Sequence, residues 1–293
     1  MLSKRIASLL RMSWKDRLAT ARYFCRRGLA RLPYAPLPIR IQLAPGETLR
    51  FWWSYVSPFF DPSRSFLDYW GNDLHDLRLL WKLLKPGMVF LDIGAHHGIF
   101  SLVAAKRVGP EGFTASFEPS PRERRRLRWH LRCNGFRSAR VESLAVGASS
   151  SVTDFFQVVS GDDTRGGLRP PQSSDATIRV PIKTIALDHY LLESSLNRVD
   201  LIKLDVEGAE MDVLRGATRV LTVLRPLILC EVLDATTLAW GYPARDIISF
   251  LQQHDFAWFD VLPDGSLAPH QIRDSYPDVR NYLAIPREKV ITG

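Results

Sequence analysis

The strongest constraint on the fold is the alternation of short apolar segments with longer helical segments from residue 88 to the C-terminus. The apolar segments have the length of strands, and the segments between them space their apolar residues as helices do. We expect strands at Met88–Asp92, Phe113–Phe117, Ser138–Ser143, Leu201–Asp205, Leu227–Val232, Ala257–Val261 and Asn281–Ile285, and helices over residues 97–107, 121–134, 208–223 and 243–253. Parallel strands need long crossovers, which are usually helices. The alternation therefore predicts an α/β fold, a mainly parallel sheet with helices on both faces.

We place the α/β domain at residues 87–293. One interval inside it departs from the alternation of strands and helices. Residues 146–183 contain two strand-like segments, 152–156 and 177–180, separated by a loop rich in Gly, Ser, Asp and Pro. This pattern predicts a hairpin insertion. Irregular segments of such length inside a domain are usually functional.

The N-terminal part of the chain divides into two predicted units. Residues 38–86 are predicted to form a unit that covers the α/β domain. It consists of a hairpin, formed by segments 39–43 and 48–53, and a helix over 63–84. Residues 1–37 predict a basic helical arm that ends in a proline-containing linker.

The net charge of +8 is concentrated in this arm. Residues 1–40 contain ten Lys or Arg and one acid, a net charge of +9, so the rest of the chain carries −1. A nearly neutral domain does not predict nucleic-acid binding. For the arm we leave three alternatives open: peripheral contact with an anionic membrane, a solvated segment, and an oligomer contact. The oligomeric state is not predicted.

The cysteines predict neither disulfides nor a metal site. Cys25, Cys133 and Cys230 are odd in number and far apart, without a CxxC pair. This usage is typical of a reducing compartment, so we expect a cytoplasmic protein. We also expect no metal, and no segment has the roughly 20 apolar residues that span a bilayer.

Acids follow the first two predicted strands. Asp92, Gly94 and Gly98 form a DxGxxxG turn between a strand and a helix, and Glu118 ends the next strand. This spacing is not the GxGxxG of dinucleotide sites. An acid at this turn suits a cationic ligand such as S-adenosyl-L-methionine, and a carboxylate ending the second strand can bind ribose hydroxyls. The competing interpretations are a structural turn and an acid that stabilises a helix N-terminus.

A third group of charges crowds the end of the strand at Leu201–Asp205. Lys203 lies within an apolar strand, and Asp205, Glu207 and Glu210 follow it. Helix capping accounts for one or two of these acids. A buried lysine is costly unless it is paired, so we expect Lys203 to contact one of them.

Residues 88–232 resemble the FkbM-type family of S-adenosylmethionine-dependent methyltransferases. The resemblance is carried by the segments Leu91–Gly98, Phe117–Pro121, Leu144–Gly147, Thr184–Asp188 and Ile202–Glu210. It implies a class I methyltransferase fold, with a seven-stranded sheet whose last strand runs antiparallel. It also implies a cofactor site in which Asp92, Gly94 and Gly98 surround the methionine part, Glu118 holds the ribose and residues 143–145 border the adenine. We expect the cofactor-binding residues to be Asp92, Gly94, Ala95, His96, Gly98, Glu118, Pro119, Ser143, Ala145 and Asp205.

The resemblance further implies methylation of a hydroxyl on a sugar, a lipid-linked saccharide or another small natural product. Such a hydroxyl needs a general base. We favour Asp205, with Glu207 and His97 as further catalytic candidates and Glu210 and His96 also considered. The alternatives are a non-catalytic binding module that keeps the fold and a nicotinamide dehydrogenase. The arginine-rich helix over 121–134 is interpreted as a solvated face, against contact with RNA or an anionic substrate.

Overall fold

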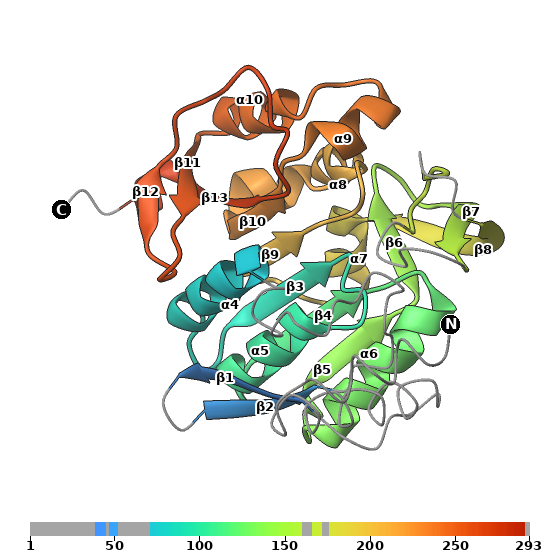
Figure 1. Cartoon of the computed structure of the whole chain (residues 1–293), viewed down its shortest axis with the longest axis vertical. Coiled ribbons are helices and arrows are strands. Elements are labelled where there is room, and N and C mark those ends of the chain that lie inside the picture. The colour runs from blue at the N-terminus through green and yellow to red at the C-terminus, as the bar shows by residue number, and fades with distance from the viewer. Residues whose placement is uncertain (1–38, 45–46, 52–70, 160–165, 172–175, 291–293) are drawn as a thin grey trace, which may run out of the picture.

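The computed structural model describes residues 39–44, 47–51, 71–159, 166–171 and 176–290. An eight-stranded sheet in the order β12-β11-β13-β10-β9-β3-β4-β5 crosses the centre of the domain (Figure 1). Its strands are β3 (Val89–Ile93), β4 (Phe113–Phe117), β5 (Ala139–Glu142), β9 (Leu201–Leu204), β10 (Leu227–Glu231), β11 (Phe256–Val261), β12 (Leu267–Pro269) and β13 (Asn281–Pro286). The five strands from β5 to β10 are parallel, and β13 runs antiparallel to both β10 and β11. The mainly parallel α/β fold and the antiparallel last strand are therefore confirmed.

The predicted number of seven strands is wrong because β12 pairs with the outer edge of β11. This strand has three residues, too few to produce a periodic apolar signal. The predicted helix over 208–223 is also wrong. The chain forms α8 (Glu210–Arg215), breaks at Gly216, and continues as the π-helical turn η2 (Val220–Leu224). A Cβ on Gly216 would lie 2.1 Å from the Gly147 carbonyl oxygen, so the break accompanies close packing against β6.

Helices cover both faces of the sheet. One face carries α4 (Gly71–Leu83), α5 (Ile99–Val108) and α6 (Pro121–Cys133), which enclose a buried cluster that includes Leu80, Leu102 and Leu127. The other face carries α7 (Leu187–Glu193), α8 and α10 (Arg245–Gln253). Shorter turns complete the chain: α9 (Asp234–Thr237), η3 (Leu238–Trp240) and η4 (Arg287–Lys289).

The insertion forms a separate small sheet. The predicted hairpin is confirmed, because β7 (Ser151–Val158) pairs antiparallel with β8 (Thr177–Ala186). The structure adds a third strand, β6 (Leu144–Gly147), which runs parallel to the end of β8. The insertion is thus anchored to the chain that leaves β5.

The N-terminal hairpin is also confirmed, with β1 (Ile39–Ala44) pairing antiparallel with β2 (Glu47–Phe51). The helix predicted over 63–84 is described from Gly71 onward as α4. The predicted arm at 1–37 and residues 52–70 lie outside the described residues. No helix in the described ranges combines the length and apolar character needed to cross a bilayer.

Candidate active site

Strands β3 and β9 are neighbours at the point where the order of the sheet reverses. The chain leaves β3 towards β4 and β5 on one side, whereas β10 lies on the other side of β9. Asp92 on β3 pairs in register with Ser116 on β4 and with Lys203 on β9. Glu118 and Asp205 each follow these partners by two residues, so the predicted acids meet at one edge of the sheet. Ligands of open α/β sheets bind at this edge, outside the carboxyl ends of the strands.

A tight turn at Gly94 ties the ends of three strands together. The N–H groups of Gly94 and Ala95 donate to the Phe117 carbonyl at 3.1 and 3.0 Å, and the Asp205 N–H donates to the Ile93 carbonyl at 3.0 Å. Gly94 has φ of +86°, and a Cβ there would lie 1.7 Å from the Asp205 carbonyl oxygen. Only glycine fits this approach, and the turn leaves backbone rather than side chain at the centre of the site.

Asp92 lies beneath this turn and is 1% exposed. The Ser101 hydroxyl on α5 donates to its carboxylate, and Ser101 and Ser116 share a hydrogen bond of 2.7 Å. Burial raises the pKa of Asp92 to about 6. The carboxylate therefore ties the end of β3 to α5 and, through Ser101, to Ser116 on β4. The direct contact with a ligand that we expected for it stays a prediction.

Glu118 is held by the backbone on both of its carboxylate oxygens. The His96 N–H donates to Oε2 and the Ser120 N–H donates to Oε1, each at 2.7 Å. Burial raises the pKa of Glu118 to about 8. Each carboxylate oxygen has a further lone pair that can accept a hydroxyl group. The geometry therefore suits the ribose-binding role expected for Glu118.

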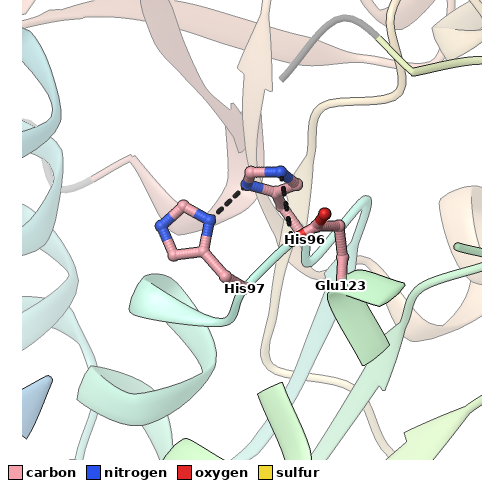
Figure 2. A group of neighbouring side chains, drawn as sticks. All are labelled: His96, His97 and Glu123. Carbon is pink, nitrogen blue, oxygen red and sulfur yellow. Dashed lines mark hydrogen bonds and ion pairs between the residues drawn. The ribbon is translucent and has the colours of Figure 1, made fainter. Parts of the chain in front are cut away.

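A pair of histidines connects this loop to α6. Figure 2 shows His96 between His97 and Glu123, with the two imidazoles joined through their Nδ1 atoms and His96 Nε2 3.6 Å from Glu123 Oε2. His96 has φ of +49°, a left-handed conformation that is uncommon for residues other than glycine. Burial, followed by the charge of His96, brings the pKa of His97 well below its usual value. The side chain of His96 thus reaches α6 while its N–H holds Glu118.

His96, His97 and Glu123 also have the side chains to hold a metal ion, since their ligand atoms lie within 4.8 Å of one another. Part of this set of atoms is already engaged, however, because the two histidines are joined through their Nδ1 atoms. Arg122 and Arg126 donate to the two oxygens of Glu123 at 2.6 and 2.7 Å. Two guanidinium charges beside the carboxylate would repel a further cation. We therefore interpret the group as a hydrogen-bonded brace for the loop after β3.

The sequence predicts that Lys203 contacts one of the neighbouring acids, and in the structure that acid is Asp205. The Lys203 ammonium donates to Asp205 Oδ2 at 3.0 Å, and the lysine is 1% exposed while the aspartate side chain is 34% exposed. Lys203 also lies over the Phe100 ring, 5.1 Å from its centroid. Although burial opposes it, the Asp205 carboxylate holds the pKa of Lys203 above its usual value. The charged lysine fixes one oxygen of a partly exposed carboxylate.

The two remaining predicted acids shape the turn after β9. Glu210 is buried, and its Oε1 accepts the N–H groups of Val206 and Gly208 at 3.0 and 3.3 Å. Burial raises its pKa to about 7. Glu210 therefore caps this turn, which agrees with the helix-capping interpretation of the acids after β9. Glu207 has φ of +55°, and its carbonyl accepts the Trp240 indole N–H at 3.1 Å.

Sequence reasoning missed two buried acids that surround Lys203. Glu231 ends β10 and is 8% exposed; burial, together with the nearby Asp205, raises its pKa well above the usual range. Asp76 on α4 is buried and accepts the Asn281 amide at 2.7 Å. The negative charges of both acids help to raise the pKa of Lys203. The position of Glu231 at a strand end was the available signal. Asp76 gave no such signal, because its helix α4 is far from β9 in the sequence.

The two residues expected at the adenine follow the end of β5, whose Glu142 carbonyl accepts the Glu118 N–H at 3.2 Å, and their contact with the cofactor stays a prediction. Ser143 is exposed at the junction between β5 and β6. Ala145 is 7% exposed, and its side chain packs with Phe155 and Ile182 in the core of the insertion. Pro119 follows Glu118, and its carbonyl accepts the Arg124 guanidinium at 2.9 Å; its contact with the cofactor stays a prediction.

The insertion lies against both loops of the site. The Ser120 hydroxyl donates to Gln157 Oε1 on β7 at 2.9 Å. At the other end, a Cβ on Gly167 would lie 3.4 Å from the Cβ of Glu207, and the Arg169 guanidinium stacks over the Trp240 ring at 4.4 Å. The insertion therefore borders the edge of the sheet where Glu118 and Asp205 lie.

The sheet order, the glycine turn after β3 and the acid after β4 define a class I S-adenosylmethionine-dependent methyltransferase. Residues 92–257 match the methyltransferase FkbM domain, and the chain belongs to this family. This membership sets aside the nicotinamide dehydrogenase considered from the sequence.

Related proteins match about half of the chain or more. The 2-O-methyltransferase NoeI of Sinorhizobium fredii is 30% identical over 185 residues, 58% of this chain and 73% of NoeI. Methyltransferase sdnD of Sordaria araneosa is 30% identical over 161 residues, 45% of this chain and 61% of that protein. Among solved structures, the FkbM methyltransferase of Methylobacillus flagellatus matches with a TM-score of 0.44 at 15% identity. That match covers 73% of this chain and half of the other.

The described residues fit S-adenosylmethionine as the cofactor. The Gly94 turn keeps side chains out of the space between β3 and β9, and two backbone N–H groups orient the Glu118 carboxylate towards the same edge. When bound, the cofactor supplies a methyl group on a positively charged sulfur. Glu118 would hold the ribose, and the loop from Gly94 to Gly98 would border the methionine part.

Proposed function

We propose that the protein methylates a hydroxyl oxygen of a saccharide, a lipid-linked saccharide or another small natural product. The observation that carries this proposal is Asp205, a partly exposed carboxylate whose Oδ2 is fixed by buried Lys203 at 3.0 Å. The relative NoeI, a 2-O-methyltransferase by name, supports oxygen as the acceptor atom.

Asp205 is suited to act as the general base. Its Oδ2 is bonded to Lys203, and within the described ranges no hydrogen bond engages its Oδ1. The Oδ1 atom can accept the proton that an acceptor hydroxyl loses as its oxygen attacks. General-base catalysis of this kind contributes about 10²- to 10⁴-fold. The lysine also holds the carboxylate in one orientation, which favours reaction by positioning.

The acceptor is expected to enter beside the insertion. Gly167 approaches the turn at Glu207, and Arg169 stacks on Trp240, which in turn bonds to that turn. The two segments border the site on the side of Asp205. We assign acceptor recognition to this side, and cofactor recognition to the side of Glu118.

The test is a methyl-transfer screen over saccharide, lipid-linked saccharide and natural-product hydroxyls, with products identified by mass spectrometry. Asp205→Asn should lower kcat by roughly 10²- to 10⁴-fold while the affinity for S-adenosylmethionine, measured by calorimetry, is retained. Asp212→Asn is the matched control, because Asp212 lies on α8 in an exposed ion pair with Arg215. Undiminished turnover in Asp205→Asn would reject the base. Methylation of amines or thiols, but of no hydroxyl, would reject the acceptor class.

A further inference from the structure

The outer side of α6 and the neighbouring edge strand β5 carry a dense basic surface. The residues that form it, here named the α6 surface, are Arg125, Arg128, Trp129, Arg132, Arg137 and Arg140. All five arginines are exposed, and the Trp129 side chain is 37% exposed. The four members on α6 follow a helical spacing that places them on one face. Arg128 connects the helix to the strand, since its guanidinium donates to the Val141 carbonyl at 3.3 Å.

Most of this charge is not neutralised by neighbouring acids. Glu123, the acid of α6, is buried and pairs with Arg122 and Arg126, which are not part of the surface. Arg140 lies 3.7 Å from Glu142, a long contact for an ion pair. For the other four arginines, the described part of the chain provides no ion pair. Since the chain outside residues 1–40 is nearly neutral, this concentration is local.

The basic arm joins the domain beside this surface. Asn134, which ends α6, accepts the Arg50 N–H at 2.9 Å and donates to the Arg50 carbonyl at 2.7 Å. Arg50 pairs across the β1–β2 hairpin with Arg40, and the next pair is Ile39 with Phe51. In Figure 1, this hairpin lies next to the lower end of α6 and β5. Residues 1–38, with most of the cations of the arm, therefore connect to the domain close to the α6 surface.

We propose that the α6 surface docks on an anionic lipid bilayer. Arginine side chains near such a bilayer are attracted by its negative surface potential. A tryptophan among them has an apolar body and a polar N–H, the combination that favours the bilayer interface.

A lipid surface fits these residues better than a nucleic acid does. Proteins that bind single-stranded RNA stack successive bases on several aromatic side chains. Trp129 is the one aromatic residue of the α6 surface. A bilayer requires no stacking platform, because it offers a continuous negative surface to a row of cations.

The experiment measures binding of the full chain to phosphatidylcholine vesicles with and without phosphatidylserine, by co-sedimentation. The triple variant Arg125→Gln, Arg128→Gln, Arg132→Gln removes three exposed cations. The control is Arg219→Gln, Arg273→Gln, Arg280→Gln, which removes three exposed arginines elsewhere on the domain. Calorimetry with S-adenosylmethionine verifies that both variants are folded.

We expect the chain to bind only the phosphatidylserine vesicles, and high salt to release it because charges are screened. The triple variant should bind on the order of 100-fold more weakly, since each cation near the surface contributes about 1 kcal/mol. The control should bind as the parent does. Equal binding to both kinds of vesicle, or equal weakening by the control variant, would overturn the proposal. So would unchanged binding of the triple variant, which would assign the contact to another part of the chain. Release from the vesicles by added single-stranded RNA at low salt, in the same co-sedimentation assay, would also overturn it.

Discussion

Glu118 should make cofactor binding strongly dependent on pH. Its carboxylate is buried, and its pKa is raised to about 8 by that burial. Ribose hydroxyls donate hydrogen bonds, so the ionised carboxylate is the form that binds them best. Below pH 8 the free protein holds a proton on Glu118 that must leave on binding. Affinity should therefore rise with pH up to about 8 and level off above it.

The size of this effect follows from the raised pKa. When only the ionised form binds, affinity falls tenfold for each pH unit below the pKa, which is about 1.4 kcal/mol per unit. Between pH 9 and pH 6 the loss should reach roughly 100-fold. Glu118→Gln should bind weakly at every pH, because the neutral amide is a poorer acceptor and its NH₂ group faces a backbone N–H.

The assay is calorimetry with S-adenosylmethionine from pH 6 to pH 9, for the parent, Glu118→Gln and the exposed control Glu111→Gln. The amino group of the ligand titrates identically in all three proteins, so the difference between parent and Glu118→Gln isolates the carboxylate. A parent whose affinity follows the same pH course as Glu118→Gln would refute this reasoning.

Two further substitutions test the frame of the site. Gly94→Ala should abolish cofactor binding and lower Tm, because its Cβ would lie 1.7 Å from the Asp205 carbonyl oxygen. Gly135→Ala, also at positive φ but with no atom within 4 Å, should cost only about 1–2 kcal/mol; equal Tm losses would contradict this account. Lys203→Met should lower the free energy of unfolding in urea by about 3–5 kcal/mol, because it removes the buried cation that pairs with Asp205 and offsets the charges of Glu231 and Asp76. That loss should be smaller at pH 5 than at pH 8, since the acids become protonated, and a loss independent of pH would contradict the pairing.

Local pattern predicted the strands of the domain well. The expected strands at Phe113–Phe117 and Asn281–Ile285 match β4 and β13 to within one residue. Buried parallel strands are short apolar runs ended by glycine or polar turns, and these features are visible in the chain itself. The same reasoning paired Lys203 with an acid, because a lysine in an apolar strand needs a partner close to it.

Contacts between segments that are distant in the sequence could not be predicted in the same way. The parallel pairing of β6 with β8, which places Ala145 in the core of the insertion, was not predicted. The brace between His96 and Glu123 depends on how α6 packs beside the loop after β3. Neither contact has a periodic signature, since each joins residues from different elements.

The sequence alone determined which side chains stand at the strand ends, because strand length and turn residues are local properties of the chain. It thereby predicted a carboxylate after β4 and a lysine paired with a nearby acid at β9. Only the tertiary structure decided how these groups are used. Burial raises the pKa of Glu118, two backbone N–H groups orient it, and Asp76 and Glu231 arrive beside Lys203 from other elements. Burial and long-range pairing arise only when the sheet assembles, and they set the electrostatics of the site.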